Sequence, residues 1–116
     1  MSLERFRIRA DQLRREIREE QRRLLEKNQR AGLIEQQIRY AENNAWLARR
    51  AGNYVLEQQY LSRVPELRRQ LIWLRQEIAR EQARLDQLVS QLRAIEDVMS
   101  LEAAGRLGRV YKQGTY

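Results

Sequence analysis

Apolar residues recur along the first half of the chain in alternating steps of three and four. One set of positions, called a, repeats every seven residues, and a second set, called d, follows each a position by three. The a positions are Leu3, Ala10, Ile17, Leu24, Ala31, Ile38, Ala45 and Gly52, and the d positions are Phe6, Leu13, Glu20, Lys27, Ile34, Ala41 and Ala48. An apolar stripe with this period, called the seam here, is buried against another helix as a left-handed coiled coil. We therefore predict a long helix over residues 3–50.

A second run of heptads follows in a different frame. Its a positions are Val64, Leu71, Ile78, Leu85, Leu92 and Met99, and its d positions are Leu67, Leu74, Glu81, Leu88, Ile95 and Glu102. Steps of seven from Gly52 lead to Gln59 and Glu66 rather than to Val64, so the two frames do not connect. The seam must break within residues 51–64.

Two places within that interval favour a turn. Gly52 and Asn53 both tolerate a positive φ, and a turn at 51–53 gives arms of nearly equal length, 3–50 and 54–104, with Pro65 as a kink. In the alternative, the first helix continues to Leu61 and the second begins at Pro65, since proline fits a first helical turn. We favour the turn at 51–53.

The predicted fold is therefore all-α: a long antiparallel two-helix coiled-coil hairpin over residues 1–104. Residues 105–116 continue no seam and are expected to form a flexible or docking tail. A dimer of long helices would use the same heptads, and only the frame break at 51–64 favours closure within one chain.

Charged residues at d positions make the register testable. A hairpin centred near residue 53 places Lys27 opposite residues around 79–81, where Glu81 is the one charged d position. A buried Lys–Glu pair costs stability but fixes the alignment of the two arms. In the alternative, both side chains extend to water.

Composition narrows the possible chemistry. The 116 residues include no cysteine and no histidine, and 34% are charged. A disulfide scaffold and a Cys/His zinc site are excluded, and the commonest catalytic bases and nucleophiles are missing. No run of about 18 apolar residues and no apolar leader is present. We predict a non-enzymatic, cytoplasmic protein without a cofactor.

A second set of apolar residues lies off the seam. Leu33, Tyr40 and Leu47 are spaced by seven, Trp46 adjoins them, and the second arm adds Ile72 and Trp73. Exposed aromatic and aliphatic residues are typical of partner-binding surfaces. Self-association through the same residues is the alternative.

Net charge is +7, and residues 1–50 contain 13 basic and eight acidic side chains. The candidate contact residues in this half are Arg14, Arg15, Arg18, Arg22 and Arg23. A solvated helix face, an acidic groove on a partner protein, nucleic acid and, least favoured, a membrane surface are the four interpretations.

The order of elements resembles the coiled-coil central-stalk protein of type III secretion and flagellar export ATPases. The resemblance covers an Arg/Gln/Glu-rich first arm, a Tyr- and Gln-bearing junction over residues 53–61 and a second arm over 67–95. It implies a stalk that inserts into a hexameric ATPase ring and contacts the export gate. No residue matches a diagnostic motif, so the resemblance assigns no site.

We thus expect a coiled-coil interaction protein, with the export-ATPase stalk as its most specific form. A basic helical nucleic-acid-binding protein and a homodimeric spacer or assembly chaperone are the alternatives.

Overall fold

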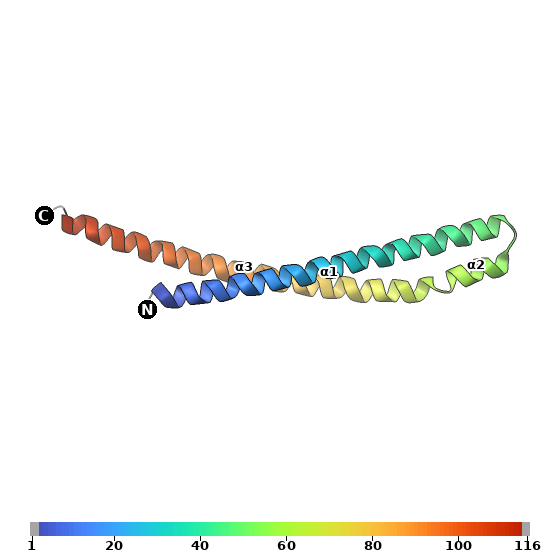
Figure 1. Ribbon diagram of the computed structural model, residues 1–116, viewed down its shortest axis with the longest axis horizontal. Coiled ribbons are helices and arrows are strands. Elements are labelled where there is room, and N and C mark those ends of the chain that lie inside the picture. Colours follow the sequence, from blue (N-terminus) through green and yellow to red (C-terminus); the bar gives the residue numbers. More distant parts are fainter. Residues whose placement is uncertain (1–2, 115–116) are drawn as a thin grey trace. The chain divides into compact units, whose positions relative to one another are not determined.

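The computed structural model describes residues 3–114, and it describes side chains as far as residue 105. Its helices are α1 (Leu3–Arg50), α2 (Tyr54–Leu61) and α3 (Val64–Gly114), and no strand occurs among the described residues (Figure 1). At the junction of α1 and α2 the chain reverses direction. The predicted all-α antiparallel hairpin is confirmed.

The chain divides into two packing units. Unit 1 combines the chain up to Gln21 with the chain from Ala83 onward, and unit 2 is Arg22–Gln82. Each unit therefore contains a stretch of α1 and a stretch of the returning arm, and each has its own apolar core.

The core of unit 1 is formed by predicted seam residues together with Val89. Leu13, Ile17 and Leu88 are buried together, and four partly buried side chains pack on them: Leu85, Val89, Leu92 and Ile95. The d position Glu20 is also buried, at 1% exposed, and its Oε2 lies 3.9 Å from Arg84 Nε. The seam of this unit therefore includes a buried carboxylate.

The core of unit 2 follows the same two frames. Its buried cluster is Ala31, Ile34, Leu71 and Leu74, with Ile38, Leu67 and Ile78 packed against it. Nearer the turn, the seam of α1 is made of the buried alanines Ala41, Ala45 and Ala48. Because alanine projects only a methyl group, this part of the seam leaves little apolar side-chain volume for α2 to pack against, and α2 has no buried residue.

The turn lies at the favoured position. Gly52 has φ +75°, and its N–H donates to the Arg49 carbonyl at 3.0 Å while the Asn53 N–H donates to the Ala48 carbonyl at 2.9 Å. These bonds satisfy carbonyls at the end of α1, as in a left-handed helix cap. Asn53 then begins α2, because its side chain accepts from the Leu56 N–H at 3.1 Å.

A second break separates α2 from α3. The Arg63 N–H donates to the Tyr60 carbonyl at 3.3 Å, which closes the last turn of α2 tightly, and Pro65 lies in the first turn of α3. The predicted kink at Pro65 is thus a short interruption at Ser62 and Arg63. The alternative with a first helix reaching Leu61 is wrong, because α1 ends at Arg50.

The second arm is longer than expected. α3 continues to Gly114, beyond the predicted end near residue 104. The side chains of residues 106–116 lie outside the described part of the chain, so the docking role expected of this tail stays a prediction.

Candidate functional site

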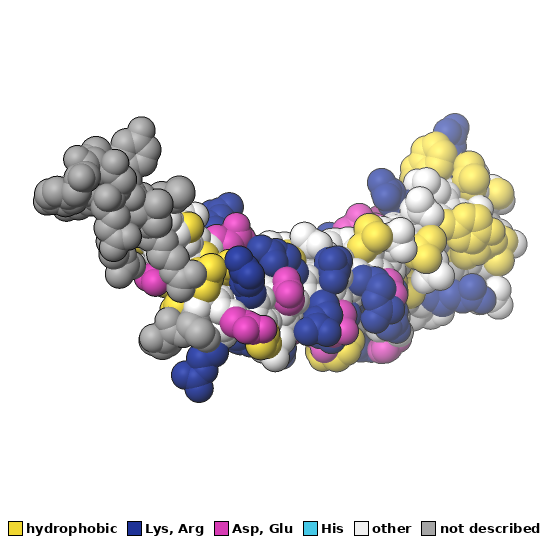
Figure 2. Space-filling view, turned by 60° about the vertical axis from the view of Figure 1, so that its left-hand side comes forward, with side chains coloured by type: hydrophobic (Ala, Val, Ile, Leu, Met, Phe, Trp, Pro, Cys, Tyr) yellow, Lys and Arg dark blue, Asp and Glu magenta, His cyan; other side chains and the backbone are white. Residues whose placement is uncertain are grey.

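Large apolar side chains are exposed at the turn end of unit 2, where Figure 2 shows hydrophobic side chains gathered on the surface. They are 55–72% exposed and comprise Leu33, Tyr40, Trp46, Leu47, Tyr54 and Val55, called the turn-end surface here. All six lie on α1 or α2, at positions that the seam does not use. Exposed apolar residues in this number are a feature of binding surfaces.

Part of this surface forms a groove between α1 and the α2–α3 break. The groove has a volume of about 760 Å³ and is called the tyrosine groove here. Its lining residues are Leu33, Gln36, Gln37, Tyr40, Ala41, Tyr60, Arg63, Glu66 and Leu67. The rings of Tyr40 and Tyr60 meet edge to face, with centroids 6.4 Å apart and planes at 79°, so they connect α1 to α2.

Some polar side chains at the rim of the tyrosine groove have hydrogen-bond partners within the described part of the protein, and others do not. Glu66 accepts hydrogen bonds from Arg69 at 3.0 Å and from Gln70 at 3.5 Å. These bonds, the one from Arg69 above all, lower the pKa of Glu66 below its usual 4.5. Arg63 has no ion pair with another described residue. The rim thus offers a free guanidinium and the amides of Gln36 and Gln37 to an incoming group.

A second groove lies between α1 and α3. It has a volume of about 500 Å³, is lined by Glu35, Ile38, Arg39, Arg68, Leu71, Ile72 and Arg75, and is called the arginine groove here. Because successive helical residues are turned by about 100°, the α1 residues of the two grooves lie on opposite sides of the seam.

The structure therefore separates the predicted apolar contact residues. Leu33 and Tyr40 line the tyrosine groove, Ile72 lines the arginine groove, and Trp46, Leu47 and Trp73 line neither. All six are exposed, as a contact surface requires. Trp46 carries the Arg50 guanidinium over its ring, 4.8 Å from the centroid.

The predicted basic contact residues are all exposed on α1. Arg14, Arg15 and Arg18 belong to unit 1, and Arg22 and Arg23 belong to unit 2. Arg14 pairs with Asp11 at 3.0 Å and Arg22 with Glu26 at 3.4 Å, both within one helical turn. Such exposed pairs contribute little to stability and leave the guanidinium available to a partner.

The predicted register pair is present in unit 2. Lys27 Nζ lies 2.5 Å from Glu81 Oε1 and 3.2 Å from Glu77 Oε2, and the three side chains are only 20–27% exposed. The hydrogen bond to Glu81 is the main cause that raises the pKa of Lys27 above its usual 10.5. The sequence prediction identified Glu81 but missed Glu77, which lies one turn before it on α3.

Sequence reasoning also missed Tyr54, Val55 and Tyr60. These residues lie in the junction between the two frames, where no seam indicates which side of a helix is covered. The missing seam over this junction could have indicated them, since a helix with no buried stripe must expose its apolar residues.

The described residues contain no group of three side chains suited to hold a metal ion. Among the helices described, none is long and apolar enough to cross a membrane. Comparison with known proteins finds no matching family model, no similar curated protein and no similar solved structure.

Proposed function

We propose that this protein is a non-enzymatic interaction protein whose helical hairpin presents the tyrosine groove to a helix of a partner protein. The observation that carries the proposal is the exposed pair Leu33 and Tyr40, at 60% and 64%, in a groove completed by Tyr60. Burying these side chains against a partner removes apolar surface from water and so favours association.

A helix is the partner element that suits the groove. The groove lies beside two antiparallel segments, and Leu33, Gln37 and Tyr40 present a helical i, i+4, i+7 face. A third helix with apolar residues at the same spacing packs its side chains between them. The free Arg63 at the rim favours a carboxylate at the edge of that helix.

The proposal is tested by site-specific photo-crosslinking in the native host. A benzophenone side chain replaces Tyr40 in one variant and Leu25 in a matched control, since Leu25 is 59% exposed on α1 in the same unit and lines neither groove. We expect a discrete protein adduct from position 40 and none from position 25. Identical adduct patterns from both positions would contradict docking at the groove, and an adduct to a second copy would support a homodimeric spacer instead.

A more specific form of this proposal is that the protein is the central stalk of an export ATPase. In this form we also propose that it is located in the cytoplasm. The support for the stalk is the resemblance of the two arms and their junction, together with the exposed arginines of α1. In this form a hexameric ATPase ring with an acidic groove is the partner. Arg14→Glu combined with Arg18→Glu should weaken retention of the ring in a pull-down without lowering helicity, and unchanged retention would exclude the stalk.

A further inference from the structure

We infer that the arginine groove is a second, independent docking site, and that its ligand is an acidic amphipathic helix of a partner protein. Three arginines and one glutamate line this groove around the apolar side chains of Ile38, Leu71 and Ile72. Positive charge beside exposed apolar surface is complementary to a helix with an apolar face and acidic flanks.

Two of the arginines are held in place by carboxylates of the opposite helix. Arg68 Nη2 lies 2.6 Å from Glu42 Oε1, and Arg75 Nη2 lies 2.6 Å from Glu35 Oε1. Both arginine side chains remain about 60% exposed. A guanidinium has five N–H donors, so each retains donors for a further carboxylate while its position is fixed.

The third arginine gives the groove a positive charge that no glutamate of these two pairs neutralises. Arg39 lies on α1 between Glu35 and Glu42, yet it forms no ion pair with the residues that the structure describes. Because the two glutamates are already bound by Arg75 and Arg68, the guanidinium of Arg39 remains available to an acidic ligand.

The apolar component indicates a helix rather than a polyanion. Ile72 is 58% exposed beside the buried Leu71, and a helix lying along the two arms would cover it. Trp46 follows Arg39 by seven residues on α1 and therefore extends the same flank toward the turn, with Arg50 over its ring. Phosphates would gain nothing from Ile72 and would be repelled by Glu35 and Glu42.

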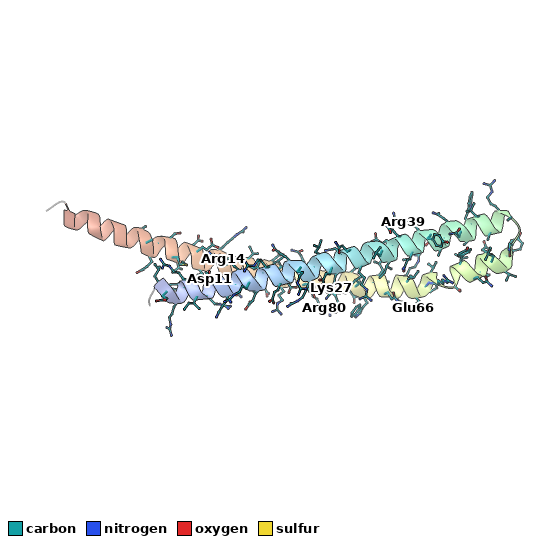
Figure 3. The ribbon with its side chains drawn as sticks, in the orientation of Figure 1. Asp11, Arg14, Lys27, Arg39, Glu66 and Arg80 are labelled. Atoms are coloured by element: carbon teal, nitrogen blue, oxygen red, sulfur yellow. The ribbon has the colours of Figure 1, made fainter. Side chains whose placement is uncertain are left out.

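The test uses the full chain and a synthetic probe. The probe is a fluorescent helical peptide of about five turns with leucines on one face and glutamates on both flanks. We expect Arg39→Gln to weaken its binding, measured by anisotropy, by roughly tenfold, since a charge-assisted contact is lost. Arg80→Gln is the matched control. Like Arg39, Arg80 is exposed and has no ion pair among the described residues. It lies on α3 and does not line the groove (Figure 3).

A second pair of variants tests the apolar contact. Ile72→Gln should weaken the peptide several-fold, whereas Leu25→Gln, at an equally exposed position outside the groove, should not. Tyr40→Gln should leave the peptide affinity unchanged, which separates this site from the tyrosine groove. Circular dichroism establishes that each variant keeps its helicity.

Two results would overturn the inference. Equal losses for Arg39→Gln and Arg80→Gln would mean that the peptide responds only to net charge. An oligonucleotide that displaces the peptide, with an affinity that also depends on Arg39, would assign the groove to nucleic acid.

Discussion

At the scale of single residues, the charged seam positions determine how the two arms align. Lys27 meets Glu81 and Glu77 within unit 2. Sliding one arm by a heptad would place Lys27 opposite Leu74 or Leu88 and leave a partly buried cation without its carboxylates. Such a penalty favours one register among several that leucine and alanine heptads alone would accept.

The pair should therefore be coupled in a double-mutant cycle. Lys27→Met leaves Glu77 and Glu81 close together without a cation, so we expect the Tm to fall by several degrees. Glu81→Met should cost less, because Lys27 keeps Glu77. The double variant has two apolar d positions and should recover at least the wild-type Tm, measured by circular dichroism in one buffer. A double variant as unstable as the two single losses combined would show that the residues act separately.

The stabilisation that Lys27 contributes should be lost at alkaline pH. Its folded pKa is raised above 10.5, mainly by the hydrogen bond to Glu81. The stabilisation is therefore fully present below the unfolded pKa and is lost as the pH rises through the folded pKa. We expect the difference in Tm between wild type and Lys27→Met to be at its full size at about pH 8 and to shrink as the pH rises toward about pH 12. Tyrosine ionisation affects both proteins, so the difference isolates Lys27, and a difference that stays constant would contradict this role.

At the scale of the elements, the turn depends on one backbone conformation. Gly52 has φ +75°, which a residue with a Cβ adopts only with strain. Gly52→Ala should therefore lower the free energy of unfolding by about 1 kcal/mol, measured by urea denaturation.

Gly32→Ala is the matched control for this substitution. Gly32 lies within α1, and a Cβ there would meet no atom within 4 Å. Alanine loses less conformational entropy than glycine in a helix, so Gly32→Ala should raise the free energy of unfolding by about 0.5–1 kcal/mol. Effects of the same sign at both positions would contradict the assignment of the turn.

The heptads were sufficient to predict the two arms of the hairpin and their buried faces. Leu13, Leu74 and Leu88 are buried where their frames place them. The mismatch between frames confined the break to residues 51–64, and the tolerance of Gly52 and Asn53 for a positive φ then favoured the turn that the structure has at Gly52. The separate helix α2 was not predicted, because Pro65 alone does not distinguish a kink from a break. The end of α3 was missed because α3 continues past the last seam position.

The candidate site was less predictable for a physical reason. A heptad pattern identifies the buried stripe, but the two flanks of that stripe become distinct surfaces only once the opposite helix is placed. Leu33 and Tyr40 line a groove with Tyr60 on one flank, whereas Ile72 and Arg39 line a groove on the other. The single apolar surface expected from the spacing of these residues is therefore divided: some of them line two grooves of different chemistry, and Trp46, Leu47 and Trp73 line neither.

At the scale of the whole molecule, each packing unit draws its core from both arms of one chain. Leu13 packs with Leu88 in unit 1, and Ile34 packs with Leu74 in unit 2. The seam is thus already closed within the chain, and a second chain is not needed to bury it. This distinguishes the hairpin from a dimer of long helices, which would share the same heptads between chains.

Thermal unfolding should therefore be independent of protein concentration. If two chains shared the seam, raising the concentration from about 1 µM to about 100 µM would add about 2.7 kcal/mol to the folded state and raise the Tm by several degrees. A hairpin closed within one chain gains nothing from the second chain, so its Tm should stay constant, and sedimentation should give a monomer mass of 14.0 kDa. A Tm that rises with concentration in wild type, and equally in a Tyr40→Gln variant, would place the association in the seam. A rise abolished by Tyr40→Gln would instead place it in the tyrosine groove, because that substitution leaves every seam residue unchanged.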